Sequence, residues 1–224
     1  MKKLVMLLAL ISIVACKNKE VKPVEEVSEP EVVEAVAEDI DYESYGMQSD
    51  DAPKGLETGS KAPVVDLIID GKKVALADLY KDQNVAIIFY RGFWCPKCNK
   101  HLSEFATKAK DLEAKGVKLI AITPEAEEGI EKTKEKTGAN FTIVSDTDGS
   151  LIRAFDVDYK VTEGYVNKVN EMLKVSISEN NAIGENKLPV PATYVINKEG
   201  TIIYSHFNPD YAERASIEDI LAAL

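Results

Sequence analysis

Trp94-Cys95-Pro96-Lys97-Cys98 is the stretch from which the fold of this chain can be inferred. It closely follows the continuous apolar run Val85–Tyr90, which is typical of a central strand covered on both faces. It opens the segment Lys97–Lys115, whose apolar residues recur at helical spacing. A strand, a cysteine pair and a helix in this order indicate an α/β domain with thiol chemistry at the strand–helix junction.

The two cysteines have distinct expected roles. Cys95 is predicted at the N-terminus of the helix, where free N–H groups and the helix dipole stabilise a thiolate, the nucleophilic form of cysteine. Cys98 lies about one turn further on and can resolve a mixed disulfide formed at Cys95. Pro96 suits the first helical turn, where a missing N–H costs nothing.

The residues around the cysteines are expected to support them. Arg91 and Lys97 are cations that can lower the pKa of Cys95, with a solvated surface charge as the alternative for each. Phe93 and Trp94 are expected to form an apolar rim for an extended substrate, with core packing as the alternative for Phe93.

Length and composition limit the number of domains and the class of protein to which this chain can belong. The chain has 224 residues, three cysteines and a net charge of -11, which suits one domain with appendages and argues against nucleic-acid binding. Residues 1–15 are predicted to be a signal peptide, with two lysines before an apolar stretch too short to span a bilayer comfortably. Ile13-Val14-Ala15-Cys16 resembles the bacterial lipoprotein processing box, which implies a lipid on Cys16 and a membrane protein facing an extracytoplasmic space such as the periplasm. An uncleaved anchor is the alternative.

The lipid at Cys16 would leave Cys95 and Cys98 as the only thiols of the mature domain. Residues 16–60 are predicted to be a disordered tether. Between Glu20 and Asp51 there are twelve acidic residues and one basic residue, Lys22. Such a segment buries too little apolar surface to fold alone, and its like charges extend it. It is interpreted as a spacer, with a partner-docking segment as the alternative.

Residues 61–224 show the alternating elements of an α/β sandwich. Strands are expected at residues 64–69, 73–75, 85–90, 117–122, 141–144, 193–197 and 201–205. Helices are expected at residues 97–115, 124–136, 150–155 and 215–224. Residues 158–187 do not fit this alternation, and we interpret them as an insertion with a helical first half and a polar loop near the cysteines.

Three motifs together resemble a known family. They are Tyr-Arg-Gly-Phe-Trp-Cys-Pro-Lys-Cys at 90–98, Leu-Pro-Val-Pro-Ala-Thr-Tyr at 188–194, and Asn-Pro-Asp-Tyr-Ala-Glu-Arg at 208–214, where Asn208 departs from the usual aspartate. The chain resembles thioredoxin-fold proteins of the alkyl hydroperoxide reductase/thiol-specific antioxidant superfamily, in its peroxiredoxin-like branch. The resemblance covers residues 61–224 and implies a three-layer α/β/α sandwich with a mixed central sheet.

The resemblance also implies a cis peptide bond between Val190 and Pro191, packed beside Cys95. A cis proline there would leave the Val190 backbone free to pair with a substrate chain. An ordinary trans proline in a loop is the alternative. Thioredoxins also carry a buried carboxylate beneath the cysteines, but Phe89 occupies the matching strand position, and the sequence does not identify a replacement.

The expected function is thiol–disulfide exchange in redox homeostasis through Cys95 and Cys98, with protein dithiols or disulfides as substrates and a separate electron donor. No organic cofactor is implied, because the electrons reside on sulfur. The alternative is an antioxidant peroxidase that reduces hydroperoxides. Peroxiredoxins carry Pro-x-x-x-Thr-x-x-Cys, whereas Ile88 and Gly92 stand at the proline and threonine positions here.

Metal handling is the remote alternative. Cys95, Cys98 and His101 lie within two helical turns, and His206 is the only other histidine. Copper-delivery proteins of thioredoxin fold use a wider cysteine spacing, and a structural zinc site wants four ligands. We therefore predict no metal site, and interpret His101 as a surface helix residue.

Overall fold

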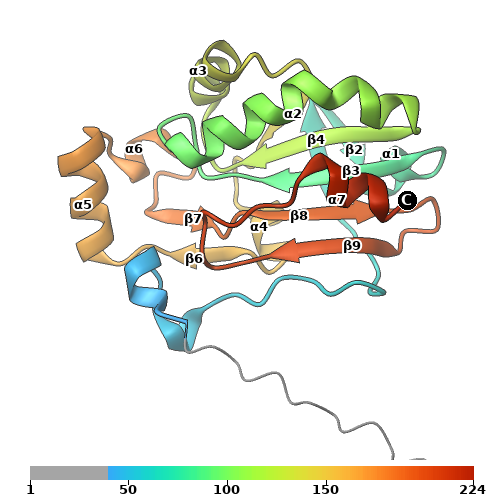
Figure 1. Ribbon diagram of the computed structural model, residues 1–224. Coiled ribbons are helices and arrows are strands. Elements are labelled where there is room, and N and C mark those ends of the chain that lie inside the picture. Colours follow the sequence, from blue (N-terminus) through green and yellow to red (C-terminus); the bar gives the residue numbers. More distant parts are fainter. Residues whose placement is uncertain (1–39) are drawn as a thin grey trace, which may run out of the picture. The chain divides into compact units, whose positions relative to one another are not determined.

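The apolar run at residues 85–90 forms the centre of a five-stranded mixed sheet in the computed structural model, which describes residues 40–224 (Figure 1). Strand β3 (Asn84–Phe89) pairs in parallel with β4 (Val117–Thr123) and antiparallel with β8 (Ala192–Ile196). The outer strands are β5 (Thr142–Ser145), parallel to β4, and β9 (Ile202–Phe207), antiparallel to β8. The order β5-β4-β3-β8-β9 confirms the predicted mixed central sheet.

Alternation along β3 sends its side chains into two separate cores. Ala86, Ile88 and Tyr90 belong to one cluster, which also contains both cysteines. Val85, Ile87 and Phe89 belong to the other. All six residues are fully buried, because helices or a hairpin cover each face of the sheet.

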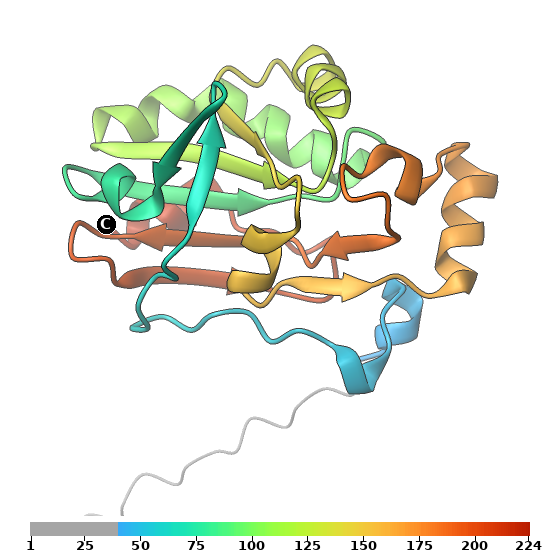
Figure 2. The same ribbon diagram turned by 180° about the vertical axis from the view of Figure 1, so that it is seen from behind.

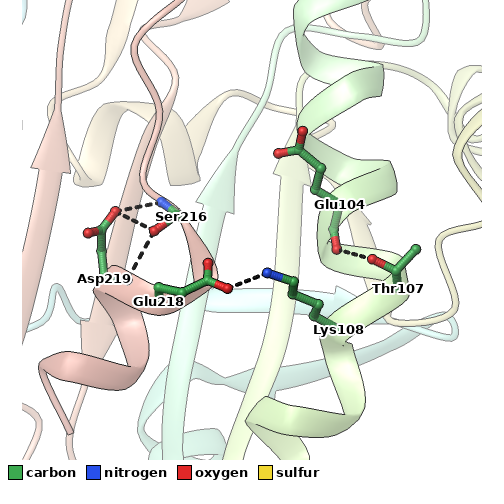
Figure 3. Close-up of polar contacts among 6 residues, drawn as sticks. All are labelled: Glu104, Thr107, Lys108, Ser216, Glu218 and Asp219. Carbon is green, nitrogen blue, oxygen red and sulfur yellow. Dashed lines mark hydrogen bonds and ion pairs between the residues drawn. The ribbon is translucent and has the colours of Figure 1, made fainter.

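Three helices cover the face that carries the cysteines: α2 (Pro96–Ala114), α3 (Glu127–Thr137) and α7 (Ile217–Ala222). The capping box at Ser216 and Asp219 begins α7, and Glu218 pairs with Lys108 of α2 (Figure 3). These contacts hold the C-terminal helix against α2. The motif at residues 208–214 directly precedes α7, and its arginine, Arg214, contacts Cys98.

The opposite face is covered by a hairpin and two short helices (Figure 2). These elements are β1 (Asp66–Ile69), β2 (Lys72–Ala75), α1 (Leu76–Tyr80) and α4 (Ser150–Ala154). Together with the first face they confirm the predicted α/β/α layering. The short helix α1 was not predicted from the sequence. Within the described residues, no helix combines the length and the hydropathy needed to cross a membrane.

The insertion at residues 158–187 is ordered and begins and ends in a small hairpin. It comprises β6 (Asp158–Lys160), α5 (Glu163–Leu173) and α6 (Ile177–Asn180), and it leads into β7 (Lys187–Pro189), which pairs antiparallel with β6. Asn181 anchors it: its backbone bridges to Glu125, and its side chain donates to the Lys187 carbonyl at 2.6 Å. The polar segment predicted as a loop thus contains the helix α6.

Residues 40–56, called here the N-terminal strap, pack on the domain rather than extending away from it. They form two 3-10 turns, η1 (Tyr42–Tyr45) and η2 (Ser49–Asp51). Met47 is only 2% exposed, and Gly55 donates its backbone N–H to the Asp156 carbonyl. The boundary predicted at residue 60 is therefore too late, because the tyrosines and Met47 give this acidic segment enough apolar surface to dock. The predicted signal peptide, Cys16 and the first part of the tether lie outside the described residues.

Candidate active site

Cys95 is the N-cap residue of α2, as predicted. Its sulfur accepts the backbone N–H of Cys98 at 3.3 Å, and Pro96 occupies the first helical turn. Both thiols are free, and both residues are buried. The helix N-terminus thus directs one of its unpaired N–H groups at the Cys95 sulfur, which stabilises negative charge there.

Arg91 is the cation at Cys95. Its guanidinium donates to the Cys95 sulfur at 3.2 Å and to the Tyr165 hydroxyl at 2.7 Å. The group stacks on the ring of Tyr211, 3.7 Å from the ring centroid. Although burial lowers the pKa of Arg91, the negative charges of Cys95 and Cys98 raise it well above its usual range. Arg91 is therefore a buried, permanently charged partner, and the alternative of a solvated surface charge is wrong.

Arg214 is a second cation, which lies at Cys98 and was not predicted from the sequence. It donates to the Cys98 sulfur at 3.6 Å and to the Tyr211 carbonyl at 2.7 Å. The segment between β9 and α7 carries it there. The signal that would have found it is the C-terminal motif at residues 208–214, which ends in this arginine.

The ionisation of one thiol opposes that of the other. Burial raises the pKa of Cys95, and the charge on Cys98 raises it further. Burial also opposes ionisation of Cys98, but the hydrogen bond from Cys95 and the charges of Arg214 and Arg91 lower its pKa well below the usual range. The pair therefore loses its first proton with a low apparent pKa and its second with a high one. The expected thiolate belongs to both sulfurs rather than to Cys95 alone.

A groove of about 240 Å³ leads to Cys95, and its lining is mainly apolar. The helix α5 forms one wall of the groove, which includes Met172 and Leu173 with 71% and 38% exposure. Trp94 and Pro96 line it as well, and Cys98 does not. Cys95 is therefore the sulfur that faces an incoming substrate.

Lys97 and Phe93 do not have the positions expected of them. Lys97 lines the groove but is exposed, and no hydrogen bond joins it to either sulfur within residues 40–224. Phe93 lies outside the groove lining, where its ring faces the ammonium groups of Lys132 and Lys136 at 4.9 and 4.8 Å. Of the two predicted rim aromatics, only Trp94 lines the groove.

The prediction of a cis bond before Pro191 is wrong. All peptide bonds of the described residues are trans. Val190 and Pro191 are buried, and the Val190 N–H donates to the Val157 carbonyl at 2.7 Å. The acceptor lies directly before the insertion, so the Val190 N–H is not free to pair with a substrate chain.

Glu125, two residues after β4, supplies a buried carboxyl group of the kind that β3 lacks. It follows the end of β4, is fully buried, and accepts the Phe93 N–H with both oxygens at 2.9 Å. Burial raises its pKa to about 8, and the Cys98 charge contributes to this rise. No pattern in the sequence singles out Glu125, because charged residues are frequent in the segment that follows β4.

The histidines do not join the cysteines. His101 is 5% exposed rather than on the surface, because its ring packs on Phe105 and hydrogen-bonds the Ala215 carbonyl at 2.8 Å. His206 lies 3.4 Å from the Glu213 carbonyl. Across residues 40–224, no three His, Cys, Asp or Glu side chains gather as a metal site requires.

Known proteins that are similar to this chain include oxidoreductases and peroxiredoxins. Residues 58–205 match the AhpC/TSA family. The chain is 31% identical over 124 residues to thiol-disulfide oxidoreductase ResA of Bacillus subtilis, covering 54% of this chain and 68% of the relative. It is also 31% identical over 103 residues to peroxiredoxin Bcp of Bacillus subtilis, covering 46% and 65%.

Among solved structures, reduced Prx3 of Vibrio vulnificus in complex with hydrogen peroxide superposes with a TM-score of 0.59. The two are 20% identical, and the match covers 75% of this chain and 99% of the other. This likeness concerns the fold.

Fold and site together define a thioredoxin-fold oxidoreductase that works through cysteine thiols. The chain belongs to the AhpC/TSA family.

Proposed function

We propose that the protein catalyses dithiol–disulfide exchange through Cys95 and Cys98. The observation that carries the proposal is a pair of free, buried sulfurs at the N-terminus of α2, each hydrogen-bonded to its own arginine. The arginines and the helix N-terminus keep one thiolate available near neutral pH. A protein disulfide or dithiol is the substrate, and a separate donor restores the pair.

The exchange proceeds in two displacements. The Cys95 thiolate attacks a substrate disulfide, forms a mixed disulfide and expels one substrate thiolate. Cys98 then loses its proton and attacks the Cys95 sulfur, which expels the second substrate thiolate and leaves the Cys95–Cys98 disulfide. Arg91 and Arg214 stabilise the charge as it passes from one sulfur to the other.

Two single variants test this order of attack. Cys95→Ser is expected to abolish reduction of a model protein disulfide such as that of insulin. Cys98→Ser is expected to accumulate a mixed disulfide at Cys95, visible by mass spectrometry. Full activity of Cys95→Ser would disprove the mechanism.

A peroxidase function is the second candidate, favoured by the Arg91 guanidinium at the Cys95 sulfur and by the small groove of about 240 Å³ that leads to it. The Cys95 thiolate would attack a hydroperoxide, releasing an alcohol or water and forming a sulfenic acid. Cys98 would then condense with it to a disulfide and release water. The rate constant for oxidation of reduced protein by hydrogen peroxide separates the two. A rate orders of magnitude above that of a free thiolate favours the peroxidase, and a rate near it favours exchange.

The proposed location is a bacterial membrane, with the domain facing the extracytoplasmic side through a lipid on Cys16. The support is the sequence pattern of residues 1–16 and the acidic segment between Cys16 and the N-terminal strap. The intact mass of the membrane-bound protein tests it. A chain that begins at Cys16 and carries a lipid is expected, and an unmodified Cys16 would contradict the proposal.

A further inference from the structure

Glu125 is buried beside the loop that carries the cysteines, and the exchange steps above do not use it. The Phe93 N–H, two residues before Cys95, donates to both of its oxygens. A Cβ added to Gly92 would lie 2.5 Å from the Glu125 Oε1 and 2.5 Å from the Trp94 Nε1. The carboxyl therefore packs tightly against residues 92–94, the segment that leads into the N-cap of α2.

The charged and titratable groups around Glu125 come from three elements: Cys98 of α2, Tyr90 beside β3, and Lys132 and Lys136 of α3. The lysines pair elsewhere: Lys132 bonds Glu128, and Lys136 reaches the Phe93 carbonyl at 3.4 Å. In the part of the chain that the structure describes, no ion pair reaches Glu125. A buried carboxylate without an ion pair favours its neutral form.

The charge on the cysteine pair acts in the same direction. The Cys98 thiolate raises the pKa of Glu125, which stands at about 8, while the Phe93 N–H and the two lysines lower it. Because this coupling is reciprocal, a proton on Glu125 also favours the thiolate. Oxidation to the disulfide removes the thiolate and, with it, one cause of the raised pKa.

We propose that Glu125 takes up a proton when the Cys95–Cys98 disulfide is reduced and releases it when the disulfide forms again. The inference rests on the proposed exchange function and deepens it. Glu125 touches neither sulfur in the structure, so it is a positioning residue that acts on the pair through its charge.

The protons and electrons balance with a dithiol as reductant. The reductant gives two electrons and two protons, and it becomes a disulfide. The cysteine pair keeps both electrons and one proton, as one thiol and one thiolate. Glu125 takes up the second proton to the extent that it is ionised in the disulfide form, and the remainder reaches the solvent. With glutamine at position 125, the second proton is released.

Proton release during reduction tests this directly. The oxidised full chain is treated with one equivalent of dithiothreitol in weakly buffered solution between pH 5 and 8, and released protons are measured with a pH indicator. At pH 7 the native protein is expected to release measurably fewer protons per disulfide than Glu125→Gln, because the variant has no group at position 125 to take one up. The difference is expected to vanish toward pH 5, where Glu125 is protonated in both redox states. Glu125→Asp should restore the native behaviour in part.

The outcomes separate the two proposals. If the native protein does not consume dithiothreitol, the exchange function fails. If both proteins consume it and release equal numbers of protons at every pH, the role of Glu125 fails. Lys132→Met keeps Glu125 and covers the case in which Glu125→Gln does not fold. Removing this cation should raise the pKa of Glu125 and extend proton uptake to higher pH, and an unchanged pH profile would overturn the inference.

Discussion

Arg91 shows how much of this site depends on single side chains. It contacts the Cys95 sulfur, the Tyr165 hydroxyl and the Tyr211 ring at once. A charge-assisted hydrogen bond of this kind contributes about 1.5 to 3 kcal/mol. The stacked, forked geometry suits a guanidinium and not an ammonium group.

Replacing Arg91 by methionine is expected to raise the pH midpoint of thiol alkylation and to slow alkylation at pH 7 about 10- to 100-fold. The physical reason is that the thiolate loses its nearest cation. The measurement is the pH dependence of the reaction with iodoacetamide. Arg91→Lys keeps the positive charge but loses the forked guanidinium group. Its pH midpoint of alkylation is expected to lie between those of the native protein and Arg91→Met. A midpoint unchanged in Arg91→Met would show that Arg91 does not stabilise the thiolate.

Gly92 explains why this chain departs from the peroxiredoxin pattern at the threonine position. A side chain there would collide with Glu125 and Trp94. Gly92→Thr is therefore expected to lower the free energy of unfolding by about 1 to 3 kcal/mol, the usual cost of overpacking, and to give no gain in peroxide reactivity. Denaturant unfolding and the peroxide rate constant measure the two effects. A stable Gly92→Thr protein with faster peroxide reduction would contradict this explanation.

At the scale of elements, local sequence patterns predicted those parts of the fold that a pattern determines. The apolar run of β3 and the helical spacing of α2 placed the two elements that meet at Cys95. Contacts between distant segments could not be predicted, because the spacing of residues along the chain does not show which segments meet in the fold. Arg214 reaches Cys98 across 116 positions, and Glu125 reaches Phe93 across 32.

The same limit explains two wrong predictions. The bond before Pro191 was inferred from a family motif, yet the β6–β7 pair and the Val157 carbonyl satisfy the backbone of this segment internally. The boundary at residue 60 was inferred from acidic composition. Composition cannot show that Met47 and Tyr45 find an apolar surface, which Tyr211 helps to form.

The N-terminal strap is expected to stabilise the domain mainly through Met47. Replacing a fully buried methionine by alanine costs about 2 to 5 kcal/mol, so Met47→Ala should lower the free energy of unfolding by an amount in this range. Urea unfolding measures it, and Gln48→Ala, at an exposed neighbouring position, is the matched control. Equal stability of the two variants would mean that the strap does not belong to the folded domain.

For the molecule as a whole, Glu125 links stability to pH. Its pKa is about 8 in the folded protein and ordinarily 4.5, so between these values the folded state binds more protons than the unfolded state. Stability must then fall as pH rises through this window. For the reduced protein the fall is on the order of a few kcal/mol. Glu125→Gln should lack this component of the pH dependence, as measured by urea unfolding from pH 5 to 8. Parallel curves for the two proteins would contradict the buried, protonated state of Glu125.

The central claim is that Cys95 and Cys98 form one redox unit. Its most direct test is peptide mapping by mass spectrometry after one equivalent of oxidant has been added to the reduced protein and after a dithiol has then been added. A Cys95–Cys98 disulfide is expected after the first step, with the loss of two thiols per chain, and both thiols are expected to return after the second. Two thiols that stay reduced, or a Cys95 sulfinic acid without any disulfide, would contradict the account.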